Sequence, residues 1–220
     1  MKQRIIIAGV CLLLGFALVE AQGPSPAARP PRPGVATPGV KRDIAVIKPL
    51  GVFAVPGNPD WQVVTKDAVW VTSSRKNIVG RLDPKTNTVV TLVETGPRPC
   101  SGLVEAFGSI WVPICGEQDK PDTKGLQRID PKTNKVTKTI ELGAPATSGA
   151  MAFGEGSLWV SITGFPITRI DPQAEKVVQQ FYGEGSGYLL TTQNSVWLAN
   201  PATVKVVRLD TRRIAATLAE

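Results

Sequence analysis

Residues 108–131, GSIWVPICGEQDKPDTKGLQRIDP, decide the fold, because both ends of this stretch recur along the chain. One end is an aliphatic segment centred on a tryptophan, and the other is Arg followed by Leu or Ile and then Asp. The tryptophans are Trp70, Trp111, Trp159 and Trp197, and the aspartates are Asp83, Asp130, Asp171 and Asp210. The tryptophans are 41, 48 and 38 residues apart, and an insertion at residues 117–124 accounts for the longest spacing. A period of about 40 residues made of short strands predicts the blades of a β-propeller.

Each repeat reads as four short strands joined by tight turns. The tryptophan strand has aliphatic residues on both sides, so both of its faces are apolar, as expected for a sheet packed between two others. Proline follows three of the four aspartates. Since proline cannot donate to a strand ladder and Asp accepts the N–H groups just ahead of it, the third strand should end there in a hairpin turn. The tryptophans are therefore assigned to the core and the aspartates to turns. The arginines, which we expect to bond carboxylates or carbonyls of neighbouring blades, are Arg81, Arg128, Arg169 and Arg208.

No window of the chain has a convincing helical period, so we expect an all-β chain with four recognisable four-stranded blades. The blades are predicted at residues 60–95, 101–142, 149–182 and 187–220, and the fourth should end on a strand at residues 214–218.

Residues 44–55 resemble a fourth, outer strand that lacks the three strands before it. The predicted domain, residues 44–220, is therefore an incomplete propeller, either truncated or open. An open ring exposes unpaired backbone groups at its ends, which favours self-association through those edges. The alternative is a compact, closed ring of four blades, in which residues 44–55 belong to no blade.

The first 21 residues are typical of a secretory signal peptide, because Lys2 precedes an apolar run at residues 5–19 and a small-residue cleavage site follows it. A retained anchor helix is the alternative. Cys11 has no small residue just before it, which argues against a lipid anchor. Residues 22–43 form a proline-rich, disordered linker. No second apolar run of spanning length follows, so we predict a secreted or periplasmic protein without a membrane span after cleavage.

The net charge of +7 is concentrated outside the predicted domain. From Asp43 onward the chain has 19 basic and 17 acidic residues, which leaves no electrostatic footprint for nucleic acid. The chain also has no histidine, and histidine is the commonest general base and a frequent metal ligand.

Two cysteines, Cys100 and Cys115, lie within the predicted domain. If Phe107 and Gly108 are the two loop residues of a hairpin, Cys100 directly faces Cys115. Directly opposed residues have Cα atoms about 4.5 to 5.5 Å apart, which a disulfide can span. A disulfide is expected in an exported chain, and a pair of free thiols in a reducing compartment is the alternative.

The GSIWV-type strand followed by RIDPKTN resembles the bacterial YVTN-type propellers, which include the virginiamycin B lyase (streptogramin lyase) family. The resemblance covers residues 44–220. It implies a propeller fold and, as an activity, a carbon–oxygen lyase or lactonase with a metal at the mouth of the channel. The lyases depend on a histidine for proton transfer, and no position of this chain offers one.

Four residues of the predicted blade ends are candidates for ligand binding. Trp61 and Tyr188 each lie nine residues before their strand tryptophan, and with Arg98 they could hold a flat or sugar-like ligand at the channel mouth. Packing at the start of a blade is the plainer role for both rings. Glu105, on an innermost strand, could act as a general base if it were desolvated, whereas a water-filled channel would leave it an ordinary carboxylate.

Glu117, Asp119 and Asp122 lie within the insertion and could gather around calcium. They lack the spacing of a known calcium loop and alternate with lysines, so a solvated loop is the favoured interpretation. We therefore predict no metal and no cofactor.

The sequence favours an exported, non-catalytic propeller that binds a protein or a small molecule. The alternative is the lyase or lactonase that the resemblance implies, and a third hypothesis is a remnant without activity. No catalytic residues are assigned.

Overall fold

The computed structural model describes residues 40–216. The predicted signal peptide and residues 22–39 of the predicted linker lie outside the described residues. The chain divides into two units, residues 1–48 and 49–220. The described part of the first unit contains the short 3-10 helix η1 (Ile44–Val46), which Asp43 caps by accepting the N–H of Ala45 at 2.9 Å. No helix in residues 40–216 is long and apolar enough to cross a membrane.

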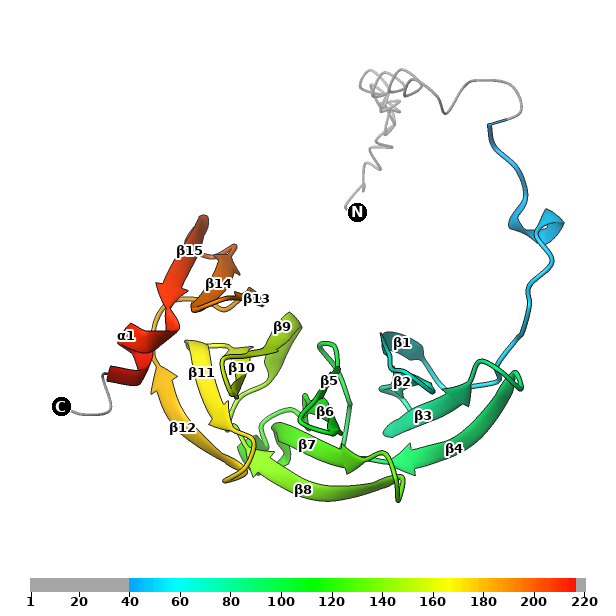
Figure 1. Cartoon of the computed structure of the whole chain (residues 1–220), viewed down its shortest axis with the longest axis horizontal. Coiled ribbons are helices and arrows are strands. Elements are labelled where there is room, and N and C mark those ends of the chain that lie inside the picture. The colour runs from blue at the N-terminus through cyan, green and yellow to red at the C-terminus, as the bar shows by residue number, and fades with distance from the viewer. Residues whose placement is uncertain (1–39, 217–220) are drawn as a thin grey trace, which may run out of the picture. The chain divides into compact units, whose positions relative to one another are not determined.

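The second unit is built from four antiparallel sheets that follow one another along the chain (Figure 1). The first sheet contains β1 (Pro59–Val64), β2 (Val69–Ser73), β3 (Ile78–Asp83) and β4 (Thr88–Glu94). The second contains β5 (Val104–Ala106), β6 (Ser109–Ile114), β7 (Gly125–Asp130) and β8 (Lys135–Glu141), with the 3-10 helix η2 (Pro121–Thr123) between β6 and β7. The third contains β9 (Ala146–Gly154), β10 (Ser157–Ile162), β11 (Phe165–Asp171) and β12 (Lys176–Phe181). The fourth contains β13 (Tyr188–Thr192), β14 (Ser195–Asn200) and β15 (Lys205–Asp210), and the helix α1 (Thr211–Ala216) follows it.

Consecutive sheets pack face to face, so the second and third sheets are covered on both faces. Trp70 of the first sheet shares a core cluster with Ile110 and Val112 of the second, and Trp111 shares one with Leu158 of the third. Within residues 49–216 the fourth sheet does not return to the first, so the ring is not closed (Figure 1). The prediction of an incomplete propeller is confirmed, and the compact four-bladed ring is wrong.

The repeated tryptophan and arginine are directly opposed on neighbouring strands in every sheet. Trp70 pairs with Arg81, and the other three pairs have the same register. Each guanidinium lies over the indole ring of its partner, 5.3 to 6.0 Å from the ring centroid, which is within the range of a cation–π interaction. The rings of the first three sheets are fully buried, because the next sheet covers them.

Two of the arginines also bond the next sheet, as the sequence predicted. Arg81 Nη1 donates to the carbonyl of Pro131 at 2.7 Å and to Asn134 Oδ1 at 2.9 Å, both in the turn between β7 and β8. Arg128 Nη1 pairs with Glu175 Oε1 at 2.6 Å, in the turn between β11 and β12. The repeat therefore ties each of these sheets to its successor through the same position.

Asp83, Asp130 and Asp171 lie in hairpin turns as the sequence predicted, whereas Asp210 precedes α1. Asp83 Oδ1 accepts the N–H of Lys85 at 2.7 Å, and Asp130 Oδ1 accepts that of Lys132 at the same distance. Asp171 and Asp210 accept backbone N–H groups at the equivalent positions. These bonds favour the charged carboxylate.

The fourth strand predicted at residues 214–218 is wrong for the described part of that range, because residues 211–216 form α1. In the first three blades the residue four positions after the aspartate closes the turn at positive φ, between 51° and 56°, and these residues are Asn87, Asn134 and Glu175. The equivalent residue of the fourth blade is Ile214, and a β-branched side chain strongly disfavours positive φ. Ile214 is buried and its carbonyl accepts Gln179 Nε2 of the third sheet at 2.6 Å. Arg169 Nη1 donates to the Oε1 of the same glutamine at 3.2 Å, so this arginine reaches the fourth blade only through Gln179.

The outer strand predicted over residues 44–55 is also not formed in the described structure. Residues 44–46 are η1, and residues 51–56 have no regular secondary structure. The N–H of Val55 donates to the carbonyl of Phe53 at 3.2 Å. The physical reason is that a fourth strand needs a third strand of its own blade beside it, and the preceding blade is not present in residues 49–216.

The indole N–H of Trp70 lacks the hydrogen bond that its counterparts make. Trp111 and Trp159 donate from Nε1 to the carbonyls of Ala106 and Gly154, each five residues earlier, at 3.1 Å. In the first sheet the turn between β1 and β2 is longer, and Thr65, the residue five positions before Trp70, hydrogen-bonds within that turn. Trp70 Nε1 therefore has no partner among the described residues.

We predict that Trp70→Phe costs less stability than Trp111→Phe. Both changes remove the same atoms from a buried site, but only the second leaves a carbonyl without its donor. An unsatisfied buried polar group costs about 1 to 3 kcal/mol, so the free energies of unfolding in urea should differ by about that amount. Equal losses, or a larger loss for Trp70→Phe, would contradict the assignment.

We also predict that stability falls steeply in acid. Backbone N–H groups lower the pKa of Asp83 and Asp130, and the Arg212 side chain lowers that of Asp210 to about 2. A folded-state pKa below the unfolded value gives stability that is present above the unfolded pKa and is lost as the pH falls through the folded one. The Asp83→Asn/Asp130→Asn variant keeps the turn acceptors without their titration. Its melting temperature should fall less than that of the parent between about pH 4 and pH 2, while Asp60→Asn should follow the parent.

Candidate functional site

The connection between β6 and β7 contains the insertion predicted at residues 117–124, and its residues 116–124 form a long loop. Its base is fixed to the connection that leads into β5. Cys115 N donates to the carbonyl of Arg98 at 2.9 Å, and Gly116 N donates to that of Pro97 at 3.0 Å. The disulfide between Cys100 and Cys115 joins the same two segments, with their Cα atoms 5.9 Å apart. The predicted disulfide is confirmed.

The route to that disulfide differs from the prediction. The hairpin does turn at Phe107 and Gly108, and Val104 pairs with Trp111 as expected. Beyond that point Cys100 N donates to the carbonyl of Pro113, so the two cysteines are not directly opposed. Ser101 and the residue after it have positive φ, 63° and 90°, which shifts the register between the two strands.

The inserted loop is held by its own hydrogen bonds. Thr123 Oγ1 accepts the N–H of Glu117 at 2.8 Å and donates to the carbonyl of Lys120 at 2.7 Å. Lys120 forms an ion pair with Glu117, which raises the pKa of the lysine. The η2 turn closes with the N–H of Lys124 on the carbonyl of Pro121 at 3.0 Å. The loop therefore has an internal framework that blade packing does not require.

A pocket of about 270 Å³ lies between this loop and the connection to β5. It is lined by Arg98, Cys115, Glu117, Gln118, Asp119, Lys124 and Pro145. Arg98 is exposed and has φ +59°, a conformation fixed by its N–H, which donates to Asn77 Oδ1 at 2.9 Å. Its side chain returns toward the insertion, where Nη1 reaches the carbonyl of Gly116 at 3.5 Å. Two cations, Arg98 and Lys124, thus share one small cavity with two carboxylates.

The acidic residues of the insertion do not gather. Asp122 is not among the pocket residues, and Glu117 is engaged by Lys120. Within the described part of the chain no three His, Cys, Asp or Glu side chains are close enough together to hold a metal ion.

The other ligand-binding candidates lie apart from Arg98. Trp61 is partly buried against the core between the first two sheets, and its ring comes within 3.7 Å of where a Cβ of Gly102 would be. Its surroundings are those of a packing residue. Glu105 is exposed on β5, opposite Ile110.

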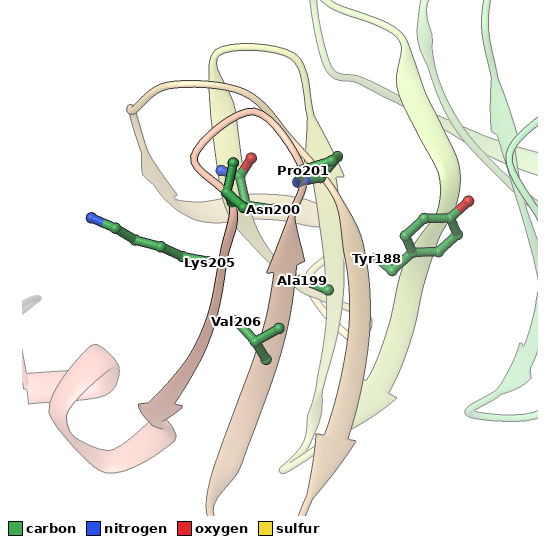
Figure 2. A pocket seen from close by; sticks show the side chains of 7 residues that line it. Tyr188, Ala199, Asn200, Pro201, Lys205 and Val206 are labelled. Carbon is green, nitrogen blue, oxygen red and sulfur yellow. The ribbon is translucent and has the colours of Figure 1, made fainter.

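Tyr188 lines a different pocket, of about 330 Å³, on the outward face of the fourth sheet. Figure 2 shows Tyr188, Ala199 and Val206, directly opposed residues of β13, β14 and β15, with Asn200 and Pro201 beside them at the end of β14. The structure therefore brings Arg98 together with Glu117 and Asp119, and separates these from Tyr188.

Sequence reasoning missed two contributors to the first pocket, Lys124 and Asn77. Asn77 has φ +54° in the turn between β2 and β3, and asparagine tolerates that conformation. The asparagine in the turn between β2 and β3 was the feature of the sequence that could have indicated a contact with Arg98.

No protein-family model matches the chain, and no curated protein matches it in sequence. Solved structures match at low identity. Virginiamycin B lyase from Staphylococcus aureus is 20% identical with a TM-score of 0.54, over 70% of this chain and 53% of that one. The fold is a β-propeller. Kuenenia stuttgartiensis hydrazine synthase is 16% identical with a TM-score of 0.51, over 74% of this chain and 53% of that one. The computationally designed Ika4 protein is 11% identical with a TM-score of 0.59, over 74% of this chain and 98% of that one.

These likenesses support a β-propeller and leave the YVTN assignment a prediction. This chain spans about half the length of the lyase and hydrazine synthase chains that it matches.

We predict that the disulfide stabilises the domain. It closes a loop of 15 residues, for which the loss of unfolded-state entropy is worth about 3 kcal/mol. The Cys100→Ala/Cys115→Ala variant should lose about that much free energy of unfolding in urea. A reductant should destabilise the parent and leave the variant unchanged. Equal stability of the two proteins would contradict a native disulfide.

Proposed function

We propose that this protein is an exported, non-catalytic propeller module that binds a small zwitterionic ligand, such as the end of a short peptide, in the Arg98 pocket. The observation that carries the proposal is the insertion at residues 116–124, which is pre-organised although the repeat does not need it. Loops held on a rigid scaffold are the usual place for binding residues.

The charge pattern of the pocket selects the ligand class. Arg98 presents guanidinium N–H donors that suit a carboxylate. Asp119 lines the same pocket and offers acceptors for an ammonium group. A ligand that carries both charges a few ångströms apart would satisfy both sides, whereas a simple anion or cation would meet one repulsive group.

Two observations support the non-catalytic and exported parts of the proposal. The chain has no histidine, so it lacks the residue that the lyases use. The disulfide is typical of compartments outside the cytoplasm, as is the predicted signal peptide.

The test is calorimetric titration with the dipeptide Ala-Ala, its N-acetyl form and its C-terminal amide. We expect Ala-Ala to bind and each blocked form to bind at least about tenfold more weakly, because each loses a charge-assisted hydrogen bond. Arg98→Asn keeps a residue that tolerates positive φ and should remove the preference for the free carboxylate. Arg75→Asn is the matched control and should bind as the parent does. No binding of Ala-Ala, or a stoichiometric divalent metal in the purified protein, would refute the proposal.

A further inference from the structure

The outward face of the fourth sheet, the side that carries Trp197, is as apolar as a face that other sheets cover. Leu190 pairs with Trp197, and Tyr188 with Ala199, so these side chains share one side of the sheet with Val206. Leu190 and Val206 are each 69% exposed, and Tyr188 is 54% exposed. Tyr188, Ala199 and Val206 line two adjoining depressions, of about 330 and 290 Å³ (Figure 2). The equivalent faces of the first three sheets are covered by the next sheet, which accounts for their fully buried tryptophans.

The arginine of this face lacks the partner that its first two counterparts have. Arg208 Nε donates to Ser195 Oγ at 2.8 Å, but its terminal nitrogens bond nothing within residues 40–216. In the first sheet those nitrogens of Arg81 reach the turn Asp130-Pro-Lys-Thr-Asn134 of the second. The first sheet has the identical sequence at residues 83–87. A turn that fits Arg208 is therefore present in this chain, at its other end.

The fourth sheet is also one strand short. Where the other sheets have an outer strand, it continues into α1, which packs toward the third sheet through Ile214. Among the described strands β15 pairs with β14 alone. Its outer edge therefore offers free N–H and C=O groups for a further strand.

Residues 50–55 correspond in sequence position to such an outer strand, and Val55 contacts the first sheet. Trp61 and Gly102 are equivalent by their distance from the strand tryptophan, so Val55 corresponds to Gly96. Gly96 follows β4, the outer strand of the first blade, and its N–H donates to Gln127 Oε1 of the second sheet at 2.9 Å. Val55 lies against Gly80, the counterpart of Gln127, with its Cγ2 3.5 Å from where a Cβ would be.

The segment 50–55 thus has the sequence position of an outer strand without its blade, and β13–β15 is a blade without its outer strand. We propose that a second copy of this chain supplies the match: its first sheet covers the outward face of the fourth sheet, and its residues 50–55 pair with β15. This inference concerns the open ends of the domain and is independent of the Arg98 pocket.

The register of the proposed pairing follows from the first blade. There Val79 of β3 pairs with Val93 of β4, and these side chains are 0% and 4% exposed. The equivalent residues are Val206 of β15 and Val52 of the partner's segment. Val206 is 69% exposed and Val52 is 81% exposed, so the pairing would bury two valines that now face solvent.

Two copies joined at both ends close a ring. The contact is head-to-tail, and such contacts either close or grow into open chains. The matched part of this chain amounts to 53% of the lyase chain, so two copies provide a comparable length of propeller. The structure therefore favours a closed dimer.

The test is sedimentation velocity on the full chain and three variants at micromolar concentration. The parent should sediment as a dimer. Leu190→Glu places a charge on the fourth-sheet side of the proposed interface. Val64→Glu, at an exposed site of the first sheet, places a charge on the first-sheet side of the same interface. Each should shift the protein to monomer, with at least about a hundredfold weaker association. Tyr182→Glu, at an exposed site outside the interface, should remain dimeric. A monomeric parent, an open-ended polymer or unchanged association of Leu190→Glu and Val64→Glu would overturn the proposal.

A cysteine pair tests the register directly. Val52→Cys/Val206→Cys should cross-link two copies into a covalent dimer on a non-reducing gel, and Tyr182→Cys/Val206→Cys should not. Because the first and fourth sheets of one copy do not meet, a cross-link within one chain, or equal cross-linking of the two pairs, would contradict the arrangement.

Discussion

The structure depends on one contact that recurs in every blade: an indole ring with a guanidinium over it, which in the first three blades lies on the face that the next sheet covers. Moving an arginine out of water requires hydrogen-bond partners for its donors. The turn of the following blade provides acceptors for the partly buried Arg81 and Arg128. The tryptophan contributes apolar area to the same contact. Because the contact is directional, each sheet specifies the presence and orientation of its successor, and the blades are stable only in series.

The insertion at residues 116–124 is not held by the tryptophan–arginine contact. Its stability comes from a disulfide, an ion pair and Thr123 hydrogen bonds rather than from apolar burial. A polar loop of that kind can keep charged groups at a pocket without weakening the core, because the sheets beneath it are already complete.

The sequence predicted the blades, the aspartate turns and the disulfide because each follows from a local pattern: periodicity, turn chemistry or cysteine spacing. Two errors came from places where tertiary context decides. Ile214 stands where the other blades close the turn with positive φ, and residues 50–55 have no third strand beside them, so neither segment follows the repeat. The Arg98 pocket was only partly predictable, since the proximity of Lys124 and Asp119 depends on how the insertion folds back, and no periodicity encodes that.

Both errors lie at the ends of the series, and this location has a physical explanation. Inside the series every sheet packs against neighbouring sheets that its side chains fit, so the local conformational preference and the tertiary packing favour the same structure. At the ends no neighbouring strand is present, and the backbone takes the conformation that satisfies it locally: a helix after β15 and a segment without regular secondary structure before β1. The side chains of Val206, Leu190 and Val52 still carry the apolar pattern of an interior blade. The backbone at each end therefore follows local preference, whereas these side chains follow the repeat, and the proposed dimer would account for both.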